Sequence, residues 1–134
     1  MFTEPRVGCG AAIIVDDRIL LVRRKRPPEI GHWGLPGGKI DLFETAAAAT
    51  EREVMEETGI AITADRLLCF VDHIDRAAGT HWTAPVFLVH AFTGSPVNRE
   101  PEKHDEVAWF ALDALPDQLT ISTRIAVAAW RQHD

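Results

Sequence analysis

Residues 38–60 read GKIDLFETAAAATEREVMEETGI, and this stretch decides how the rest of the chain is interpreted. The run from Thr45 to Thr58 is predicted to be a helix, because alanine favours the helical state and Gly59 stands where a helix-ending glycine is common. Four glutamates fall within seven residues of it, at positions 51, 53, 56 and 57. Like charges at helical spacing repel one another, so this concentration of acid needs an explanation.

The spacing places three of these carboxylates together, because residues three or four positions apart share one helix face. Glu53, Glu56 and Glu57 therefore project on the same side, and Arg52 lies one turn before Glu56, where it can brace a carboxylate. Hard divalent cations such as Mg²⁺ prefer oxygen ligands. A metal site and an ordinary solvated acidic face both remain open from spacing alone. The side expected to be buried carries Ala47, Ala48, Val54 and Met55.

The segment that precedes this helix is rich in glycine. Residues 31–38 read GHWGLPGG, with four glycines and a proline in eight residues. Such a segment brings backbone groups close to a partner, and backbone N–H groups and carbonyls are suited to binding phosphate or metal. A glycine-rich bend leading into an acidic helix therefore favours a site for a metal-bound phosphate.

The remaining elements predict a mixed α/β domain. Residues 7–15 and 18–24 are expected to form a hairpin, and residues 67–74, 82–92 and 107–110 further strands. Pro85 suggests that the strand over 82–92 begins irregularly or lies at a sheet edge. A helical turn is expected over 112–115 and a closing helix over 121–132. The apolar residues along one side of this last helix are Ile121, Ile125, Ala128 and Ala129.

Composition narrows the function classes. A chain of 134 residues fits one domain, 1–134, and its net charge of -6 argues against binding to a nucleic acid polymer or an anionic membrane. The N-terminal residues show no basic leader, and no apolar run reaches membrane-spanning length, so a cytoplasmic location is expected. Cys9 and Cys69 are expected to be unpaired thiols inside apolar stretches.

The residues of the opening stretch resemble the signature of the Nudix hydrolase family. Nine specified positions over 23 residues agree with it: Gly38, Glu44, Arg52, Glu53, Val54, Glu56, Glu57, Gly59 and Ile60. The flanking LPGG, the early hairpin and the late EVAWFALDALP extend the resemblance over essentially the whole chain. It implies an α/β/α sandwich around a mixed sheet, and an enzyme that cleaves a nucleoside diphosphate linked to another moiety with Mg²⁺ or Mn²⁺.

The resemblance also implies roles for residues of the box, here meaning residues 38–60. Glu56 and Glu57 would be direct metal ligands, with Gly37 contributing backbone, and Glu53 a further ligand or the base that activates water. Arg52 would orient Glu53, while Glu44 and Gly59 would be structural. Some members take the base from a late loop instead, and both alternatives stay open. The candidates there are Glu100, Glu102, Asp105 and Glu106.

Substrate contacts are expected beside the box. Candidates are Arg23, Arg24, Arg26, Gly38, Trp33, Trp82, Glu102, Lys103 and His104. Each tryptophan is as compatible with core packing as with stacking on a base. The late EPEKHDEVAWFALDALP stretch resembles MutT-type and ADP-ribose-pyrophosphatase-like members, which favours a nucleoside triphosphate as substrate. The alternatives are ADP-ribose or a nucleotide sugar and, in a different class, a non-catalytic nucleotide sensor. Homodimers are common in the family, so a homodimer is an open expectation here.

One position of the box departs from the family pattern. Many members have glycine immediately before the glutamate at position 44, whereas this chain has Phe43. The entry into the helix is therefore expected to differ in shape.

Overall fold

The computed structural model describes residues 1–133. Its elements follow one another as β1 (Arg6–Val15), β2 (Arg18–Arg24), β3 (Trp33–Gly34), β4 (Gly37–Lys39), α1 (Ala46–Thr58), β5 (Leu67–Asp75), β6 (Thr80–Val89), β7 (His104–Ala111) and α2 (Ile121–His133). The strands pair in the order β3-β2-β1-β6-β5, with β4 joined to β1 and β7 joined to β2. Only the β1–β6 pairing is parallel among the strand pairs of the described residues, so the sheet is mixed, as expected.

Strand β1 is the element that the two parts of the sheet share. It turns into β2 through Asp16 and Asp17, which both have positive φ, at 53° and 58°. Two successive residues of positive φ match the twist of a tight hairpin, and aspartate tolerates this conformation better than most residues. The middle of β1 also pairs with β4, Gly10 opposite Gly37 and Cys9 opposite Gly38. The glycine segment is thereby fixed against the centre of the molecule.

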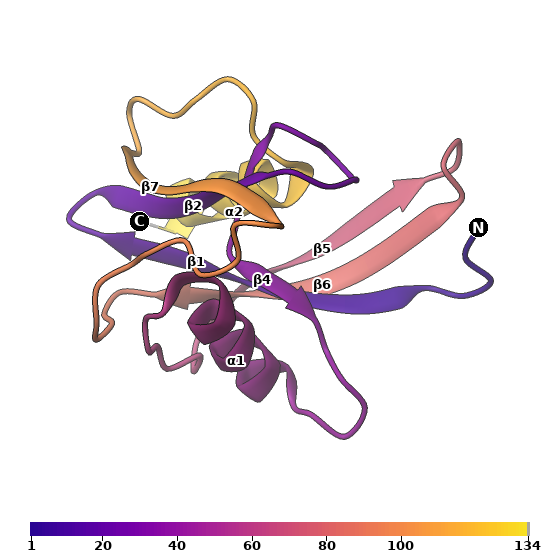
Figure 1. Ribbon diagram of the computed structural model, residues 1–134, viewed down its shortest axis with the longest axis horizontal. Helices are drawn as coiled ribbons and strands as arrows, with labels where there is room; N and C mark the ends of the chain where they lie inside the picture. Colours follow the sequence, from indigo (N-terminus) through magenta and orange to yellow (C-terminus); the bar gives the residue numbers. More distant parts are fainter. Residues whose placement is uncertain (134) are drawn as a thin grey trace.

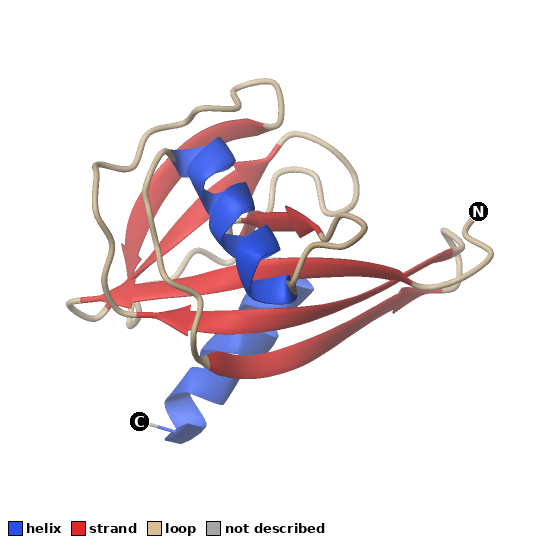
Figure 2. Ribbon diagram, turned by 90° about the horizontal axis from the view of Figure 1, so that it is seen from below, coloured by secondary structure: helices blue, strands red, loops and turns tan. Residues whose placement is uncertain are grey.

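The two helices cover opposite sides of the long strands (Figure 1; Figure 2). Helix α1 packs against β4 and β1, while α2 packs mainly against β5. Residues between the layers are large and fully buried, including Ile13, Ile19, Leu20 and Leu21. The β5–β6 hairpin extends well beyond α1 in Figure 1. The expected α/β/α sandwich is confirmed.

Helix α1 begins and ends as its sequence predicts. The Thr45 hydroxyl accepts a hydrogen bond from Ala48 N–H at 3.1 Å, and Gly59 ends the helix with φ 75°. The prediction of its buried side was wrong in part, because Met55 and Ala48 are exposed and Thr50 and Thr58 are fully buried. The two threonines can be buried since their hydroxyls donate to carbonyls four residues earlier, at 2.8 and 2.7 Å.

Three other elements differ from the sequence expectation. Strand β6 ends at Val89 and lies between β1 and β5, so Pro85 is not at an edge; it lies where the ladder to β1 is interrupted, between the pairs Val7–Thr83 and Gly10–Val86. Residues 112–115 contain a single turn closed by the Ala114 N–H, which donates to the Ala111 carbonyl at 3.0 Å, rather than a turn of α-helix. In α2 the buried residues are Thr123, Ala126 and Val127, whereas Ile121 and Ile125 are partly exposed.

The loop between β4 and α1 contains the unusual Phe43, whose side chain is 97% exposed and whose φ is 70°. This backbone conformation costs a non-glycine residue roughly 1–2 kcal/mol, which explains why glycine suits the position. Asparagine tolerates the conformation without the extra unfolded-state entropy of glycine. We expect Phe43→Asn to raise the free energy of unfolding by about 0.5–1 kcal/mol in chemical denaturation. A variant less stable than the wild type would contradict this expectation, because it would mean that the exposed Phe43 ring makes a stabilising contact.

Candidate active site

Arg52 is the centre of an ion-pair network where α1 meets β4. Its Nε and Nη2 donate to the two carboxylate oxygens of Glu44 at 2.7 and 2.9 Å, a bidentate pair. Its Nη1 donates to Glu53 at 2.9 Å and to both oxygens of Glu56 at 3.3 Å, and its Nη2 also reaches the Lys39 carbonyl at 3.1 Å. These hydrogen bonds lower the pKa of Glu44 to about 2. One guanidinium therefore positions three carboxylates of the box and also binds the backbone of β4.

Glu57 lies in a different environment, because it is buried beneath the glycine segment. Its Oε1 accepts the Gly37 N–H at 2.7 Å, and its Oε2 lies 3.5 Å from Nε2 of His104. Burial raises the pKa of Glu57 to about 8, while burial lowers the pKa of His104 to about 4. A carboxylate buried with so little compensating charge is costly. Glu57 therefore occupies a position where a cation would stabilise it.

Gly38 brings the backbone of β4 against Glu53. A Cβ added at Gly38 would overlap the carboxylate group of Glu53, so only glycine permits this approach. Glu53 is itself partly buried, which raises its pKa, and Arg52 acts in the opposite direction. The two carboxylates of Glu53 and Glu57 thus flank the consecutive residues Gly37 and Gly38.

Gly37 permits the pairing of β4 with β1, and this gives a stability prediction. A Cβ at Gly37 would collide with the Cys9 carbonyl, which is backbone and cannot rotate away. At Gly10, the residue opposite, an added Cβ meets its nearest atoms at 3.6–3.7 Å, an ordinary contact. We expect Gly37→Ala to lower the free energy of unfolding by about 1–3 kcal/mol or more in urea denaturation, and Gly10→Ala to change it much less. Equal effects of the two substitutions would contradict this packing.

The late loop between β6 and β7 lies against the C-terminal end of α1 and closes one side of the site. The N–H groups of Val97 and Arg99 donate to the Thr58 and Glu57 carbonyls at 2.9 and 3.0 Å, which satisfies groups that a helix end leaves free. Glu100 follows directly. Its Oε2 lies 3.2 Å from Nζ of Lys103, and its buried Oε1 has no hydrogen-bond partner within the described part of the chain. The negative charge of Glu100 is close enough to raise the pKa of Glu57.

The structure brings some of the expected substrate residues together and separates others. Arg24 lines a cavity beside Gly37 and Gly38, whereas Arg23 and Arg26 do not line it. Trp82 lines the same cavity, while Trp33 packs with the core, its ring 4.7 Å from that of Phe110. Glu102 and Glu106 are exposed, and so is Asp105, near Lys25. His104 is buried against Glu57 instead of facing solvent.

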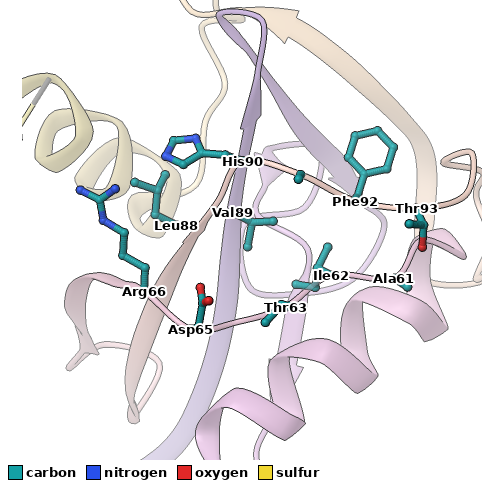
Figure 3. A pocket seen from close by; sticks show the side chains of 11 residues that line it. Ala61, Ile62, Thr63, Asp65, Arg66, Leu88, Val89, His90, Phe92 and Thr93 are labelled. Carbon is teal, nitrogen blue, oxygen red and sulfur yellow. The ribbon is translucent and has the colours of Figure 1, made fainter.

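Two of the surface cavities differ in their position relative to the box. The one that Gly37 and Gly38 line has a volume of about 330 Å³. The other, of about 460 Å³, lies between the segment after α1 and the end of β6; Figure 3 shows Arg66, His90 and Phe92 around it. It contains none of the box residues. Of these two, the smaller cavity is therefore the one that adjoins the box, through Gly38 and Lys39.

The donor set suits a hard divalent cation, although its side chains are not gathered into a cluster. Within residues 1–133 no group of three acidic, histidine or cysteine side chains is close enough to hold a metal, because Arg52 holds Glu53 and Glu56 while Glu57 bonds to Gly37. The chemistry nevertheless fits, since all donors are carboxylates and a buried Glu100 oxygen lacks a partner. Glu56 is half exposed and lies 3.3 Å from Arg52.

Sequence reasoning identified the box, but it missed two contacts that shape the site. The His104–Glu57 pair joins residues 47 positions apart, at the start of β7 and the end of α1, and no local pattern signals it. The burial of Oε1 of Glu100 depends equally on how the late loop folds. The free cysteines, by contrast, agree with expectation: Cys9 is buried and Cys69 half-buried. Neither helix over residues 1–133 is long and apolar enough to span a membrane.

Comparison with known proteins identifies the class that this fold and site define. The NUDIX domain family model matches residues 4–130, so the chain belongs to the Nudix family, and it is a Nudix hydrolase. The crystal structure of a MutT NUDIX hydrolase from Burkholderia pseudomallei superimposes with a TM-score of 0.92 at 59% identity, covering 94% of this chain and 98% of that one.

Two curated relatives carry the names of different activities. An ADP-ribose pyrophosphatase of Methanocaldococcus jannaschii is 33% identical over 116 residues, which is 87% of this chain and 68% of the relative. A Mycobacterium tuberculosis protein, provisionally named 8-oxo-dGTP diphosphatase 2, is 37% identical over 115 residues, 84% of this chain and 77% of the relative. The two names give different substrates, ADP-ribose and 8-oxo-dGTP.

Proposed function

We propose that this Nudix hydrolase is a Mg²⁺-dependent pyrophosphohydrolase that converts a nucleoside triphosphate to the monophosphate and pyrophosphate. The observation that carries the proposal is the junction at Gly37 and Gly38. On one side these residues contact the carboxylates of Glu57 and Glu53, and they also line the cavity of about 330 Å³. A phosphate chain bound along them would connect a nucleoside in the cavity to a metal at the carboxylates.

The size of the cavity favours a nucleoside triphosphate over a larger diphosphate. Pockets for small ligands have volumes of about 300–1,000 Å³, so this one is at the lower end and suits a single nucleoside. The second ribose of ADP-ribose would have to lie outside it. ADP-ribose stays the second candidate because a relative of that name is 33% identical to this chain. A non-catalytic sensor is disfavoured, since every carboxylate of the signature is present.

The proposed division of labour follows from the contacts. Glu53, Glu56 and Glu57 would hold Mg²⁺ or Mn²⁺, with backbone of Gly37 beside them. When bound, the metal would neutralise pyrophosphate charge and lower the pKa of the attacking water. Arg52 would keep Glu53 and Glu56 oriented through its hydrogen bonds at 2.9 and 3.3 Å. Arg24, at the cavity wall, would attract the phosphate chain.

Glu100 is the residue of the late loop that we propose to complete the site. Its buried, unpartnered Oε1 and its electrostatic effect on Glu57 distinguish it from Glu102, which is exposed. In this position it would accept a proton from the attacking water or add an oxygen ligand. We expect Glu100→Gln to lower kcat roughly 10²-fold, the scale of a lost general base, and Glu102→Gln to leave it within about twofold. The opposite order in steady-state assays would assign the role to Glu102.

A nucleotide panel tests the function itself. Purified protein is incubated with each common nucleoside triphosphate, with ADP-ribose and with a nucleotide sugar, with Mg²⁺ and again with EDTA. Monophosphate and pyrophosphate from a triphosphate, formed only with the metal, are the expected products. Cleavage of ADP-ribose alone would support the second candidate. Tight binding without turnover of any compound would instead make the protein a sensor.

A further inference from the structure

The cavity beside Gly37 and Gly38 has a flat, small-residue wall that suits a planar ring. Alternate positions of neighbouring strands line it, namely Gly8 and Gly10 of β1, Val71 of β5, and Ala84 and Val86 of β6. Side chains two residues apart project from the same face of a sheet, so these residues form one continuous surface. None of them carries a hydrogen-bonding side chain. Specificity for a bound ring must therefore come from the polar groups at the rim of the cavity.

Glu29 is the acidic residue at that rim, and the structure holds it firmly. Its backbone has a positive φ of 61°, and its Oε2 accepts a hydrogen bond from the Ile121 N–H at 2.9 Å, which ties the loop to the start of α2. Arg24 fixes the same loop by donating to the carbonyls of Pro28 and Pro27 at 2.7 and 3.3 Å. The carboxylate is thus placed in advance of ligand binding, with its side chain only 20% exposed.

The second carboxylate oxygen of Glu29 is free to accept a hydrogen bond from a ligand. Within residues 1–133 it makes no hydrogen bond, and its nearest ion-pair partner, Nδ1 of His73, is 4.0 Å away. His73 lines the cavity together with Glu29 and Trp82. A carboxylate accepts hydrogen bonds and donates none, and each of its oxygens has two lone pairs. The ligand that fits this rim is one that presents N–H donors to Glu29.

We propose that Glu29 determines base specificity and that the cavity takes a guanine-type base. Guanine presents two adjacent donors, N1–H and the 2-amino group; Oε1 of Glu29 can accept one of them, and the lone pair of Oε2 that the Ile121 N–H does not use can accept the other. Adenine and cytosine present one amino donor beside an unprotonated ring nitrogen, whose lone pair would face a carboxylate lone pair. This inference rests on the proposed function in taking the substrate to be a nucleotide; it adds which base is preferred and which residue selects it.

The direct test measures binding of GMP, IMP and AMP by calorimetry without metal, so that no turnover is involved. GMP should bind at least about tenfold more tightly than AMP, with IMP, which lacks the 2-amino group, in between. Glu29→Gln should bring the GMP and AMP affinities to within about twofold, because an amide offers one acceptor and one donor. The control is Glu4→Gln, an exposed carboxylate outside the cavity, which should keep the wild-type preference.

Three results would overturn the inference: equal or tighter binding of AMP in the wild type, an unchanged preference in Glu29→Gln, and no binding of any of the three monophosphates. Thermal denaturation of each variant checks that it is folded, because Glu29 also accepts a hydrogen bond from the Ile121 N–H. In Glu29→Gln the glutamine carbonyl can keep that bond. Glu29→Asn, which shortens the side chain, should lose the preference as well. If Glu29→Asn is unfolded, the affinities of Glu29→Gln alone decide whether Glu29 selects the base.

The inference and the proposed function can fail separately. The ratio of kcat/KM for dGTP over dATP is measured with Mg²⁺ for the wild type and Glu29→Gln. Hydrolysis of both nucleotides at equal rates, with the ratio unchanged by the substitution, would reject the role of Glu29 and keep the pyrophosphohydrolase. A GMP preference that depends on Glu29 without any hydrolysis would keep the base pocket and reject the proposed reaction.

Discussion

Glu57→Gln should lower kcat/KM for the triphosphate substrate by about 10²–10⁴-fold, the equivalent of several kcal/mol of lost transition-state stabilisation. Glutamine keeps the shape of the side chain and an oxygen that can accept the Gly37 N–H, now 2.7 Å from Glu57. It removes the buried negative charge that would hold the metal. Steady-state kinetics with Mg²⁺ measure the loss.

The same variant has a second readout that separates metal binding from folding. A buried amide costs less than a buried carboxylate, so the metal-free variant should be at least as stable as the metal-free wild type. A ligand that binds the folded state raises its stability, so Mg²⁺ should raise the melting temperature of the wild type and not that of the variant. The matched control is Glu51→Gln on the same helix, whose carboxylate binds the Ala64 N–H at 2.8 Å. Near-normal activity in Glu57→Gln would refute Glu57 as a ligand.

Arg52→Lys should have the next largest effect, lowering activity roughly 10–100-fold, as substitutions that disturb the orientation of metal ligands do. Lysine keeps the positive charge, but its single ammonium cannot hold Glu44 with two hydrogen bonds while it reaches Glu53 and Glu56. The loss should include weaker activation by Mg²⁺, measured as a higher metal concentration at half-maximal rate.

The control for this substitution is Arg66→Lys, at the rim of the other cavity, which should behave as the wild type. If Arg52→Lys has normal activity and normal metal dependence, the charge of Arg52 matters and its geometry does not. That outcome would contradict a positioning role for the guanidinium.

The sequence predicted the elements that local physics determines. The start of α1 follows from Thr45 and its end from Gly59, and both are local capping effects. The nine positions of the signature predicted the family, which the NUDIX domain model over residues 4–130 confirms, because their spacing on a helix and a glycine bend is itself short-range information. The bounds of the five predicted strands were correct to within three residues for the same reason, whereas β3 and β4, in the glycine-rich segment, were not predicted.

What the sequence did not predict depends on contacts between distant segments. The buried side of α1 contains Thr50 and Thr58, whose hydroxyls donate hydrogen bonds to the helix's own backbone. A prediction based on apolar residues alone therefore missed both threonines. In the site, Glu57 becomes buried because His104 of β7 and Gly37 of β4 meet over it. The position of Glu29 at the cavity rim likewise requires α2 to be docked.

Phe43 shows the same division between local and distant effects. The sequence predicted that Phe43, in place of glycine, gives the helix entry a different shape. The backbone at Phe43 instead has φ 70°, in the left-handed region that favours glycine. The network behind it is intact as well: Glu44 accepts the Asp41 N–H at 3.1 Å and pairs with Arg52. The conformation typical of glycine is therefore kept, and the strain remains at Phe43.

The most direct test of the central claim follows phosphorus products by ³¹P NMR as the wild type acts on a panel of nucleoside triphosphates with Mg²⁺. We expect a monophosphate and pyrophosphate from at least one of them, no reaction with EDTA, and at most about a hundredth of the rate in Glu57→Gln. Release of inorganic phosphate with a diphosphate left over would contradict it. So would a rate in Glu57→Gln equal to that of the wild type.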